Sequence, residues 1–256
     1  ADNSRDFEEL FTKASEEAMV AFGDGGLYIE KLLEGARHIE VQIVGDGTRY
    51  IHCFDRECSL QRRRQKIWEE APAFDVDSIV REQMLVQSVS LARHLGYTGL
   101  GTVEFLYDPN SREYYFIEMN TRLQVEHPVT ESITGIDLVQ ESLKIAGGEA
   151  LAYKQEEVAL TGHSIECRIN AEDPDRRFLP RPGTVTEIEV PDSPNVRFDS
   201  FLFPGYKIPP YYDSLIGKLI VTGSSREKCL EILRDTLFLT QIKGIPTTLT
   251  LHRRLV

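Results

Sequence analysis

The sequence has no long hydrophobic run and no excess of basic residues. It contains no uninterrupted apolar stretch of about 20 residues, which argues against an ordinary membrane-spanning helix. Lysine and arginine total 29 against 41 aspartates and glutamates, giving a formal net charge of −12 at pH 7. This balance argues against non-specific nucleic-acid binding, which needs a basic surface. With 41% hydrophobic and 27% charged residues in 256, the composition is that of a folded globular chain.

Cysteines are few, and their spacing suggests no cross-link. The four cysteines form no CxxC pair, so neither a zinc ribbon nor a disulfide framework is indicated. The first ten residues, ADNSRDFEEL, lack the charged-then-apolar pattern of a secretory signal. We therefore expect a cytoplasmic protein, or a mitochondrial-matrix protein if the source is eukaryotic, with neither membrane nor nucleic acid among its partners.

Apolar residues recur at helical spacing in four segments. The last of these is predicted to start with a capping box of Ser224 and Glu227 and to end at Gly244. The predicted helices cover residues 6–22, 78–95, 136–146 and 225–242.

Between these helices the hydrophobic period changes to two. Residues 38–44 alternate cleanly, which predicts a half-buried strand, and a turn leads into a second strand at 50–54. Residues 101–121 predict a hairpin, and the chain becomes strand-rich after a polar stretch near 150–160. Helices mixed with adjacent hairpins favour an α+β fold with an antiparallel sheet over a Rossmann fold.

The hairpin is acidic at positions that face each other. With its turn centred on Ser111, residues pair when their numbers sum to about 222, so Glu104 faces Glu118. Carboxylates about 5 Å apart repel unless a cation lies between them. Asn120 shares this face, two residues further on. Two carboxylates and an amide oxygen suit Mg²⁺ or Mn²⁺, and magnesium commonly completes its shell with nucleotide phosphates.

Polar residues continue at alternate positions after Asn120. If the backbone stays extended, Arg122, Gln124 and Glu126 follow the metal ligands along one edge. A phosphate held by the metal would then meet an anion bound by Arg122, with Glu126 able to accept a proton. A solvent-exposed strand face carrying mixed charges explains the same spacing.

Residues 118–131, EMNTRLQVEHPVTE, closely resemble the signature of biotin carboxylases, a branch of the ATP-grasp superfamily. The resemblance runs essentially from end to end. Supporting stretches occur in order at residues 37–42, 58–66, 69–72, 162–174 and 209–214.

The resemblance implies the second half of an ATP-grasp fold, an antiparallel sheet with helices, followed by the α+β C-terminal domain of biotin carboxylases. Residues 1–33 would be the remainder of the lid and hinge, 34–158 the ATP-grasp core and 159–256 the C-terminal domain. The family's N-terminal domain and glycine-rich lid are not represented. We therefore expect little or no turnover from this chain alone, because closure over the phosphates needs the lid.

The implied activity is ATP-dependent carboxylation of carrier-bound biotin with bicarbonate, through carboxyphosphate. ATP with Mg²⁺ or Mn²⁺ would be required, and biotin would be a substrate on a partner. The expected partners are a biotin carboxyl carrier and a carboxyltransferase, and we expect a homodimer or a larger carboxylase assembly. The carboxyltransferase would choose the final acceptor.

The resemblance also assigns roles residue by residue. Glu126 resembles the base that deprotonates bicarbonate, and Arg168 resembles the residue that stabilises the enolate-like oxygen of biotin. Local pattern alone leaves simpler alternatives open: Lys66, Arg168 and His38 could each be an ordinary surface residue. The implied metal ligands are Glu104, Glu118 and Asn120, the bicarbonate-binding set is Lys66, Arg122, Gln124 and Val125, and the nucleotide-binding set is Glu30, Lys31, Leu33, His38 and Gln61.

Two other functions remain open. Another ATP-grasp enzyme, such as a carboxylate–amine ligase, would share the metal hairpin without needing residues 124–127 or the segment around Arg168. A non-catalytic assembly module derived from an ATP-grasp fold is the second. Biotin- and bicarbonate-dependent release of ADP separates a biotin carboxylase from the other ligase. MgATP binding measured before and after Glu118→Gln tests the non-catalytic module.

Overall fold

The structure is a computed structural model that describes residues 4–256, and the chain forms two compact units, residues 1–35 and 36–256. In the first unit, α1 (Ser4–Phe22) confirms the helix predicted at 6–22. The chain turns after it at Gly23, whose φ of 74° suits glycine. The Ser15 hydroxyl donates to the carbonyl of Gly25 at 2.7 Å, which holds the start of the following segment against the helix.

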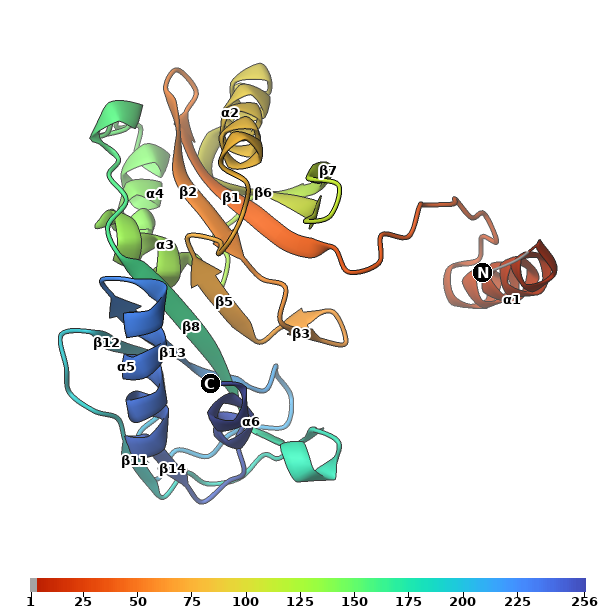
Figure 1. The fold of residues 1–256 in the computed structure, drawn as a ribbon. Coiled ribbons are helices and arrows are strands. Elements are labelled where there is room, and N and C mark those ends of the chain that lie inside the picture. The colour runs from red at the N-terminus through yellow and green to blue at the C-terminus, as the bar shows by residue number, and fades with distance from the viewer. Residues whose placement is uncertain (1–3) are drawn as a thin grey trace. The chain divides into compact units, whose positions relative to one another are not determined.

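An antiparallel sheet of eight strands forms the centre of the second unit (Figure 1). The strands run in the order β12-β13-β8-β5-β2-β1-β6-β7, and every pairing is antiparallel. This confirms the predicted α+β class. The strands are β1 (Arg37–Asp46), β2 (Tyr50–Glu57), β5 (Trp68–Ala71), β6 (Thr98–Asp108), β7 (Glu113–Asn120), β8 (His163–Asn170), β12 (Val196–Ser200) and β13 (Leu215–Gly223).

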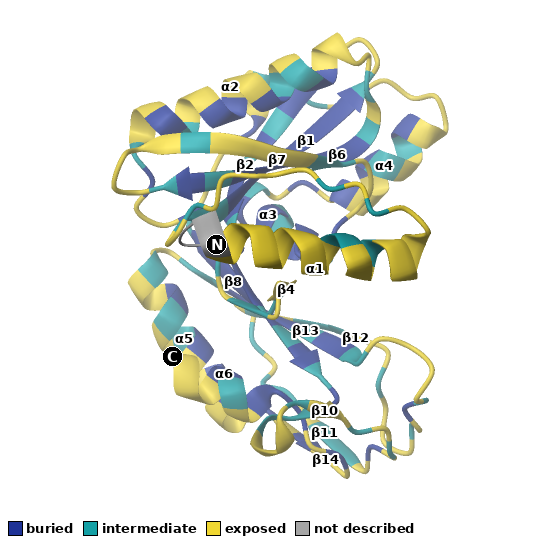
Figure 2. Ribbon diagram, turned by 90° about the vertical axis from the view of Figure 1, so that its right-hand side faces the viewer, coloured by how far each residue is buried: buried dark blue, intermediate teal, exposed yellow. Residues whose placement is uncertain are grey.

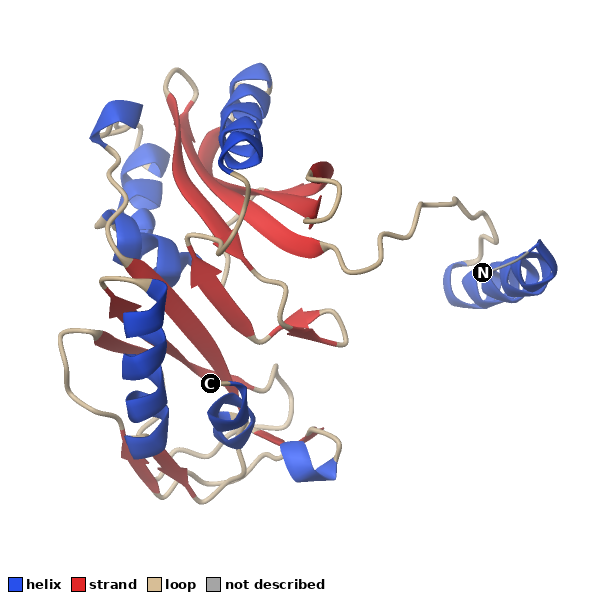
Figure 3. Ribbon diagram, in the orientation of Figure 1, coloured by secondary structure: helices blue, strands red, loops and turns tan. Residues whose placement is uncertain are grey.

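Helices cover both faces of this sheet (Figure 3). On one face, α2 (Ser78–His94) packs on β1, β2 and β6, and α5 (Arg226–Leu239) packs on β8 and β13. On the other, α3 (His127–Thr134) lies over β2, β5 and β8, and α4 (Leu138–Ala146) packs near β6. The remaining helices are α6 (Leu249–Leu255), η1 (Gln155–Glu157) and η2 (Pro174–Arg176).

Three two-stranded pieces accompany the large sheet. The β3–β4 hairpin carries the basic segment 61–66, and its turn places Arg63 and Arg64 at φ values of 49° and 65°. The three pairs are β3 (Gln61–Arg62) with β4 (Gln65–Lys66), β9 (Glu172–Asp173) with β10 (Leu179–Pro180), and β11 (Glu187–Glu189) with β14 (Gln241–Lys243).

The prediction that β1 is half-buried is wrong. Both of its faces are buried, and the polar side chains of Glu40 and Gln42 have essentially no exposure. Figure 2 shows β1 largely dark blue, while the outer side of α2 is exposed. The reason is that the polar face of β1 meets a buried charge from the neighbouring strand, Arg56 of β2.

Three local predictions also need correction. The helix α5 is capped by Ser225, whose side chain accepts from the backbone N–H of Lys228, rather than by Ser224. It ends at Leu239 because the chain turns extended at Thr240 and enters β14. Extended backbone ends at Asn120, before a turn leads into α3, so the expected continuation of the strand to residue 126 is wrong.

Candidate active site

A row of charged side chains crosses the sheet on the face that carries α3. Strand register places Glu118 opposite Glu104, Glu104 opposite Glu40, and Glu40 opposite Arg56. Residues directly opposite on neighbouring strands point to the same face, so four successive strands present these groups side by side. The predicted Glu104–Glu118 pairing is confirmed. The sequence did not predict that the row continues to Glu40 and Arg56.

Arg56 neutralises the buried end of this row. Its Nε donates to Glu40 at 2.7 Å, and neither side chain is exposed. Burial raises the pKa of Glu40, but Arg56 and Lys66 outweigh this effect and lower it to about 2. The guanidinium also donates to Gln42, Thr102, Gln124 and Thr130.

Lys66 joins three carboxylates. Its Nζ lies 2.5 Å from Glu40, 3.0 Å from Glu104 and 2.6 Å from Glu126. Only 14% of the side chain is exposed, so Lys66 is not the surface lysine that local pattern left open. Burial lowers its pKa, but these carboxylates raise it above the ordinary value. Lys66 therefore remains a cation between the acidic hairpin and Glu126.

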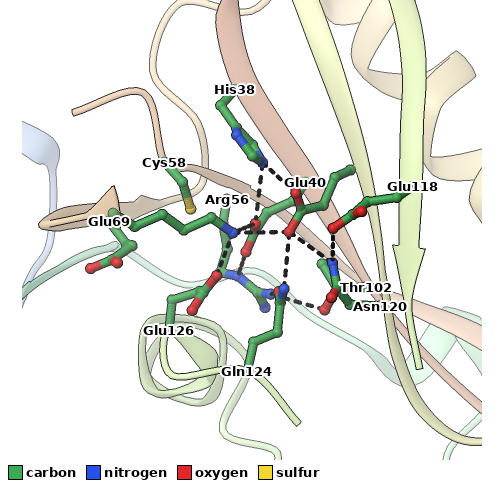
Figure 4. A network of polar contacts seen from close by, with 12 residues as sticks. His38, Glu40, Arg56, Cys58, Glu69, Thr102, Glu118, Asn120, Gln124 and Glu126 are labelled. Carbon is green, nitrogen blue, oxygen red and sulfur yellow. Dashed lines mark hydrogen bonds and ion pairs between the residues drawn. The ribbon is translucent and has the colours of Figure 1, made fainter. Parts of the chain in front are cut away.

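The carboxylates of Glu104 and Glu118 converge on one amide. Asn120 Nδ2 donates to Glu118 at 2.9 Å (Figure 4) and to Glu104 at 3.1 Å. Its Oδ1 accepts from Arg122 at 3.3 Å. A half-turn of this amide would present Oδ1 to the two carboxylates, giving the oxygen set that Mg²⁺ or Mn²⁺ prefers. These donors therefore fit a divalent ion.

Glu104 also contacts a second amide and a histidine. Gln124 donates to it at 2.9 Å, and His38 Nε2 lies 2.9 Å from its other oxygen. Burial raises the pKa of Glu104, but the His38 contact and Lys66 lower it to about 2. A second possible cation site is formed by His38, Glu40 and Glu104. One ligand atom from each of these residues lies within 4.8 Å of the other two. Glu40 there already binds two cations, so that group is the poorer cation site.

Glu126 lies between two cations. One oxygen accepts from Lys66 at 2.6 Å and the other from Arg168 at 2.9 Å. Glu126 is the N-cap residue of α3, with φ −80° and ψ 6°. The start of this helix therefore positions the carboxylate, and not the extended strand that the sequence predicted. Gln124, two residues earlier, is buried, and its carbonyl accepts from the backbone N–H of His127 at 3.4 Å.

Arg168 approaches Glu126 from β8. Its Nε donates to Glu69 at 2.6 Å and its Nη2 to Glu126 at 2.9 Å, with 17% of the side chain exposed. It is therefore not a surface arginine. The carbonyl of Arg168 accepts from Thr248 at 3.1 Å and from His252 Nε2 at 2.8 Å, which anchors this part of β8 to α6.

Three more predicted residues belong to this region. Arg122 is exposed and donates to the carbonyl of Leu123. The carbonyl of Val125 accepts from Lys218 at 3.0 Å. His38 Nδ1 lies 3.1 Å from the amide of Gln61, so it is a partly buried member of the cluster and not an isolated surface histidine.

One cavity collects the predicted residues of the second unit. It has a volume of about 400 Å³. Glu30, Lys31 and Leu33 belong to the first unit, where Glu30 and Lys31 are exposed. The eleven predicted residues that line the cavity are His38, Gln61, Lys66, Glu104, Glu118, Asn120, Arg122, Gln124, Val125, Glu126 and Arg168.

Comparison with known proteins agrees with this geometry. Residues 1–154 match the family described as carbamoyl-phosphate synthase L chain, ATP binding domain, and residues 166–256 match the biotin carboxylase C-terminal domain. This chain belongs to the biotin carboxylase family. The predicted family and its ATP-grasp fold are thereby confirmed.

Relatives share sequence over nearly the whole chain. The biotin carboxylase of Nostoc sp. is 51% identical over 252 residues, which are 98% of this chain and 56% of that protein. The Campylobacter jejuni biotin carboxylase, solved as a β,γ-ATP complex, is 46% identical with a TM-score of 0.92, covering 99% of this chain and 56% of that one. The biotin carboxylase domain of a thermophilic 2-oxoglutarate carboxylase, solved with bicarbonate, is 44% identical with a TM-score of 0.94. The match covers 99% of this chain and 57% of that one. The chain thus spans about half the length of these relatives.

Proposed function

We propose that the protein containing this biotin carboxylase-family chain carboxylates carrier-bound biotin with bicarbonate, using ATP. One observation carries this proposal: Lys66 bonds simultaneously to Glu104 of the acidic hairpin and to Glu126 at the start of α3. A phosphate held at the hairpin and a small anion beside Glu126 would therefore lie on either side of one cation. Such an arrangement suits phosphoryl transfer from a nucleotide to a one-carbon acid.

The metal ligands in this proposal are Glu104, Glu118 and the Oδ1 of Asn120. Their convergence on one amide, described above, supports a shared ion. Bound Mg²⁺ or Mn²⁺ would neutralise charge on the nucleotide phosphates. Glu104 and Glu118 would therefore bind the nucleotide phosphates indirectly, through this ion.

Bicarbonate would bind between Lys66, Arg122, Gln124 and the backbone of Val125. Two cations and two amide groups are a suitable set for a small planar anion. Glu126 would take the bicarbonate proton, after which the bicarbonate oxygen forms a bond to the γ-phosphorus and ADP leaves. This gives carboxyphosphate. Buried cations next to Glu126 stabilise the extra charge that develops on the anion.

Arg168 would act in the next step, at biotin. Its guanidinium lines the same cavity as Glu126 and is bonded to it. As N1 of biotin loses its proton, charge moves to the ureido oxygen, and a fixed guanidinium is the strongest side-chain donor for that oxygen. N1 then forms its bond to the carboxyl carbon of carboxyphosphate, the C–O bond to phosphate breaks, and the released phosphate takes the N1 proton.

For the nucleotide base we propose Glu30, Lys31 and Leu33, and for the groups near the ribose we propose His38 and Gln61. We infer the same three parts as the sequence indicated, 1–33, 34–158 and 159–256, and the two family matches at 1–154 and 166–256 support the second boundary. The inferred partners are a biotin carboxyl carrier and a carboxyltransferase, within a homodimer or larger carboxylase assembly.

A cytoplasmic location is our inference for this protein. The four cysteines are free and buried, as expected in a reducing compartment. No helix within residues 4–256 is long and apolar enough to cross a membrane.

The test of the proposed function is release of ADP from MgATP by the protein that carries this chain. We expect release to require both bicarbonate and biotin, and Glu126→Gln to abolish it while MgATP still binds. The matched control is Glu131→Gln, one turn further along α3 and outside the cavity lining. Release stimulated by an amine substrate instead of biotin would indicate a carboxylate–amine ligase. MgATP binding unchanged by Glu118→Gln would favour a non-catalytic module.

A further inference from the structure

Two buried carboxyl groups lie behind the site and have no part in the mechanism above. Glu69 of β5 and Glu166 of β8 are directly opposite each other in the sheet, and neither is exposed. Glu69 Oε1 accepts from Arg168, but Glu69 Oε2 and both oxygens of Glu166 have no hydrogen-bond partner among the described residues. A buried carboxylate without partners is costly when ionised, so these oxygens need an explanation.

The surroundings of Glu166 favour its neutral form. Opposite it on β13 lies Ile220, which packs with Val129 and Ile133 of α3, so one side is apolar. The nearby cations already have partners: Arg168 binds two carboxylates, and Lys218 Nζ donates to the carbonyl of Val125 and lies 3.6 Å from Asp199. The charged or titratable groups around Glu166 are Glu69 on β5, Arg168 on β8, Lys218 on β13, Glu126 before α3, and His127 and Glu131 on α3.

We propose that Glu69 and Glu166 are a positioning pair for Arg168, in which Glu166 holds a proton and Glu69 carries the negative charge. The charge on Glu69 fixes the Nε edge of Arg168. The neutral Glu166 adds no second charge that would draw the guanidinium away from Glu126. For its effect on biotin, this inference rests on the proposed function.

The geometry around Arg168 supports such a role. Its backbone carbonyl is bonded to Thr248 and His252, and its Nε is bonded to Glu69, so the residue is held at both ends. Its Nη1 makes no hydrogen bond with any described residue, and the guanidinium lines the cavity. An arginine fixed in this way loses little side-chain freedom when it binds an oxygen in the cavity.

Electrostatics agrees on which carboxyl takes the proton. Burial and the nearby Glu69 raise the pKa of Glu166 well above its ordinary value. Burial also raises the pKa of Glu69, to about 7, with Arg168 opposing the rise. Glu166 is therefore protonated before Glu69. Acidification would then protonate Glu69 and release the Nε edge of Arg168.

The first experiment observes Arg168 directly, by NMR of the protein labelled with ¹⁵N-arginine. The Arg168 Nε–H resonance, assigned by its loss in Arg168→Lys, is expected to be protected from exchange in the wild type. Glu69→Met, which leaves no oxygen to accept from this Nε–H, should remove the protection. The matched control is Glu70→Met, because Glu70 is a neighbouring buried residue on the opposite face that binds His163 and Arg226; this variant should change only the Arg226 resonance. Protection that survives Glu69→Met, or is lost equally in Glu70→Met, overturns the proposal.

The second experiment tests the proton on Glu166 by comparing the unfolding of the wild type with that of Glu166→Gln. A glutamic acid that is neutral when folded but ionised when unfolded makes the folding equilibrium constant fall about tenfold per pH unit above the unfolded pKa. The ratio of folding constants, variant over wild type, should therefore rise about tenfold per unit from about pH 5 to about pH 8. A constant ratio means that Glu166 is ionised in the fold and overturns the proposal.

A third measurement applies even if Glu166→Gln does not fold. The infrared spectrum of the wild type in D₂O at neutral pH should retain the carbonyl band of a protonated carboxyl group, and its absence overturns the proposal. None of these measurements needs ATP or biotin. Failure of ADP release would refute the proposed function and leave the assignment of the pair unaffected.

Discussion

Arg56→Met tests whether the buried row of charges is a single unit. Arg56 is fully buried and pairs with Glu40, which is equally buried. Methionine keeps the approximate length of the side chain but removes every donor. Glu40 would keep only its contact with Lys66, at 2.5 Å. The other groups that would lose a donor are Gln42, Thr102, Gln124 and Thr130.

The magnitude follows from the burial of this pair. Removing one partner of a buried ion pair costs about 3–5 kcal/mol, and the remaining Lys66 contact places Arg56→Met near the lower end, at about 3 kcal/mol. A domain is stabilised by only about 5–15 kcal/mol, so this is a large fraction. With a urea m-value of about 2 kcal/mol/M, the midpoint of unfolding should fall by about 1.5 M.

Urea unfolding followed by fluorescence or circular dichroism measures this shift. Lys228→Met is the matched control, because Lys228 forms an exposed pair with Glu231, and its midpoint should not change measurably. The double variant Glu40→Gln/Arg56→Met should be more stable than the sum of the two single effects, since no unpaired carboxylate remains. A midpoint shift below about 0.5 M for Arg56→Met, or strict additivity in the double variant, would refute this reasoning.

Three further predictions follow from single residues. Burial lowers the pKa of His252 to about 4. The free energy of unfolding should therefore fall by about 3 kcal/mol as the pH drops from about 6.5 to about 4. Urea unfolding across that range should show this loss in the wild type and not in His252→Gln. Glu118→Gln should weaken MgATP binding at least about tenfold by calorimetry, whereas Glu113→Gln, on the same strand but outside the cavity lining, should not. A Cβ at Gly223 would lie 2.5 Å from the backbone nitrogen of Cys229, so Gly223→Ala should cost about 1–3 kcal/mol and lower the melting temperature; an unchanged melting temperature would contradict the close packing there.

The acidic hairpin could be predicted because its register depends on local information. The turn pairs Asp108 with Glu113, and the register set there continues to Phe105 and Phe116. A β-bulge between Phe105 and Glu104 then brings Glu104 opposite Glu118, so the prediction was right about the pair without foreseeing the bulge. Glu126 was harder to place. The chain leaves the strand at Asn120, and Pro128, at the first turn of α3, was a usable signal for a helix start there.

The buried charges could not be predicted from local pattern. The alternation in residues 38–44 is the same whether its polar face meets water or Arg56, since Arg56 comes from a different strand. The burial of Glu69 and Glu166 likewise depends on pairing between segments about a hundred residues apart in sequence. Long-range pairing decides such positions, and periodicity within one segment carries no information about it.

We propose above all that the acidic hairpin holds a divalent ion beside Lys66 and Glu126. The most direct test is the anomalous scattering of Mn²⁺ in crystals of the protein grown with MnADP. We expect a peak between the carboxylates of Glu104 and Glu118. A peak in the His38–Glu40–Glu104 group instead, or these two carboxylates turned away from each other with the ion bound elsewhere, would contradict it.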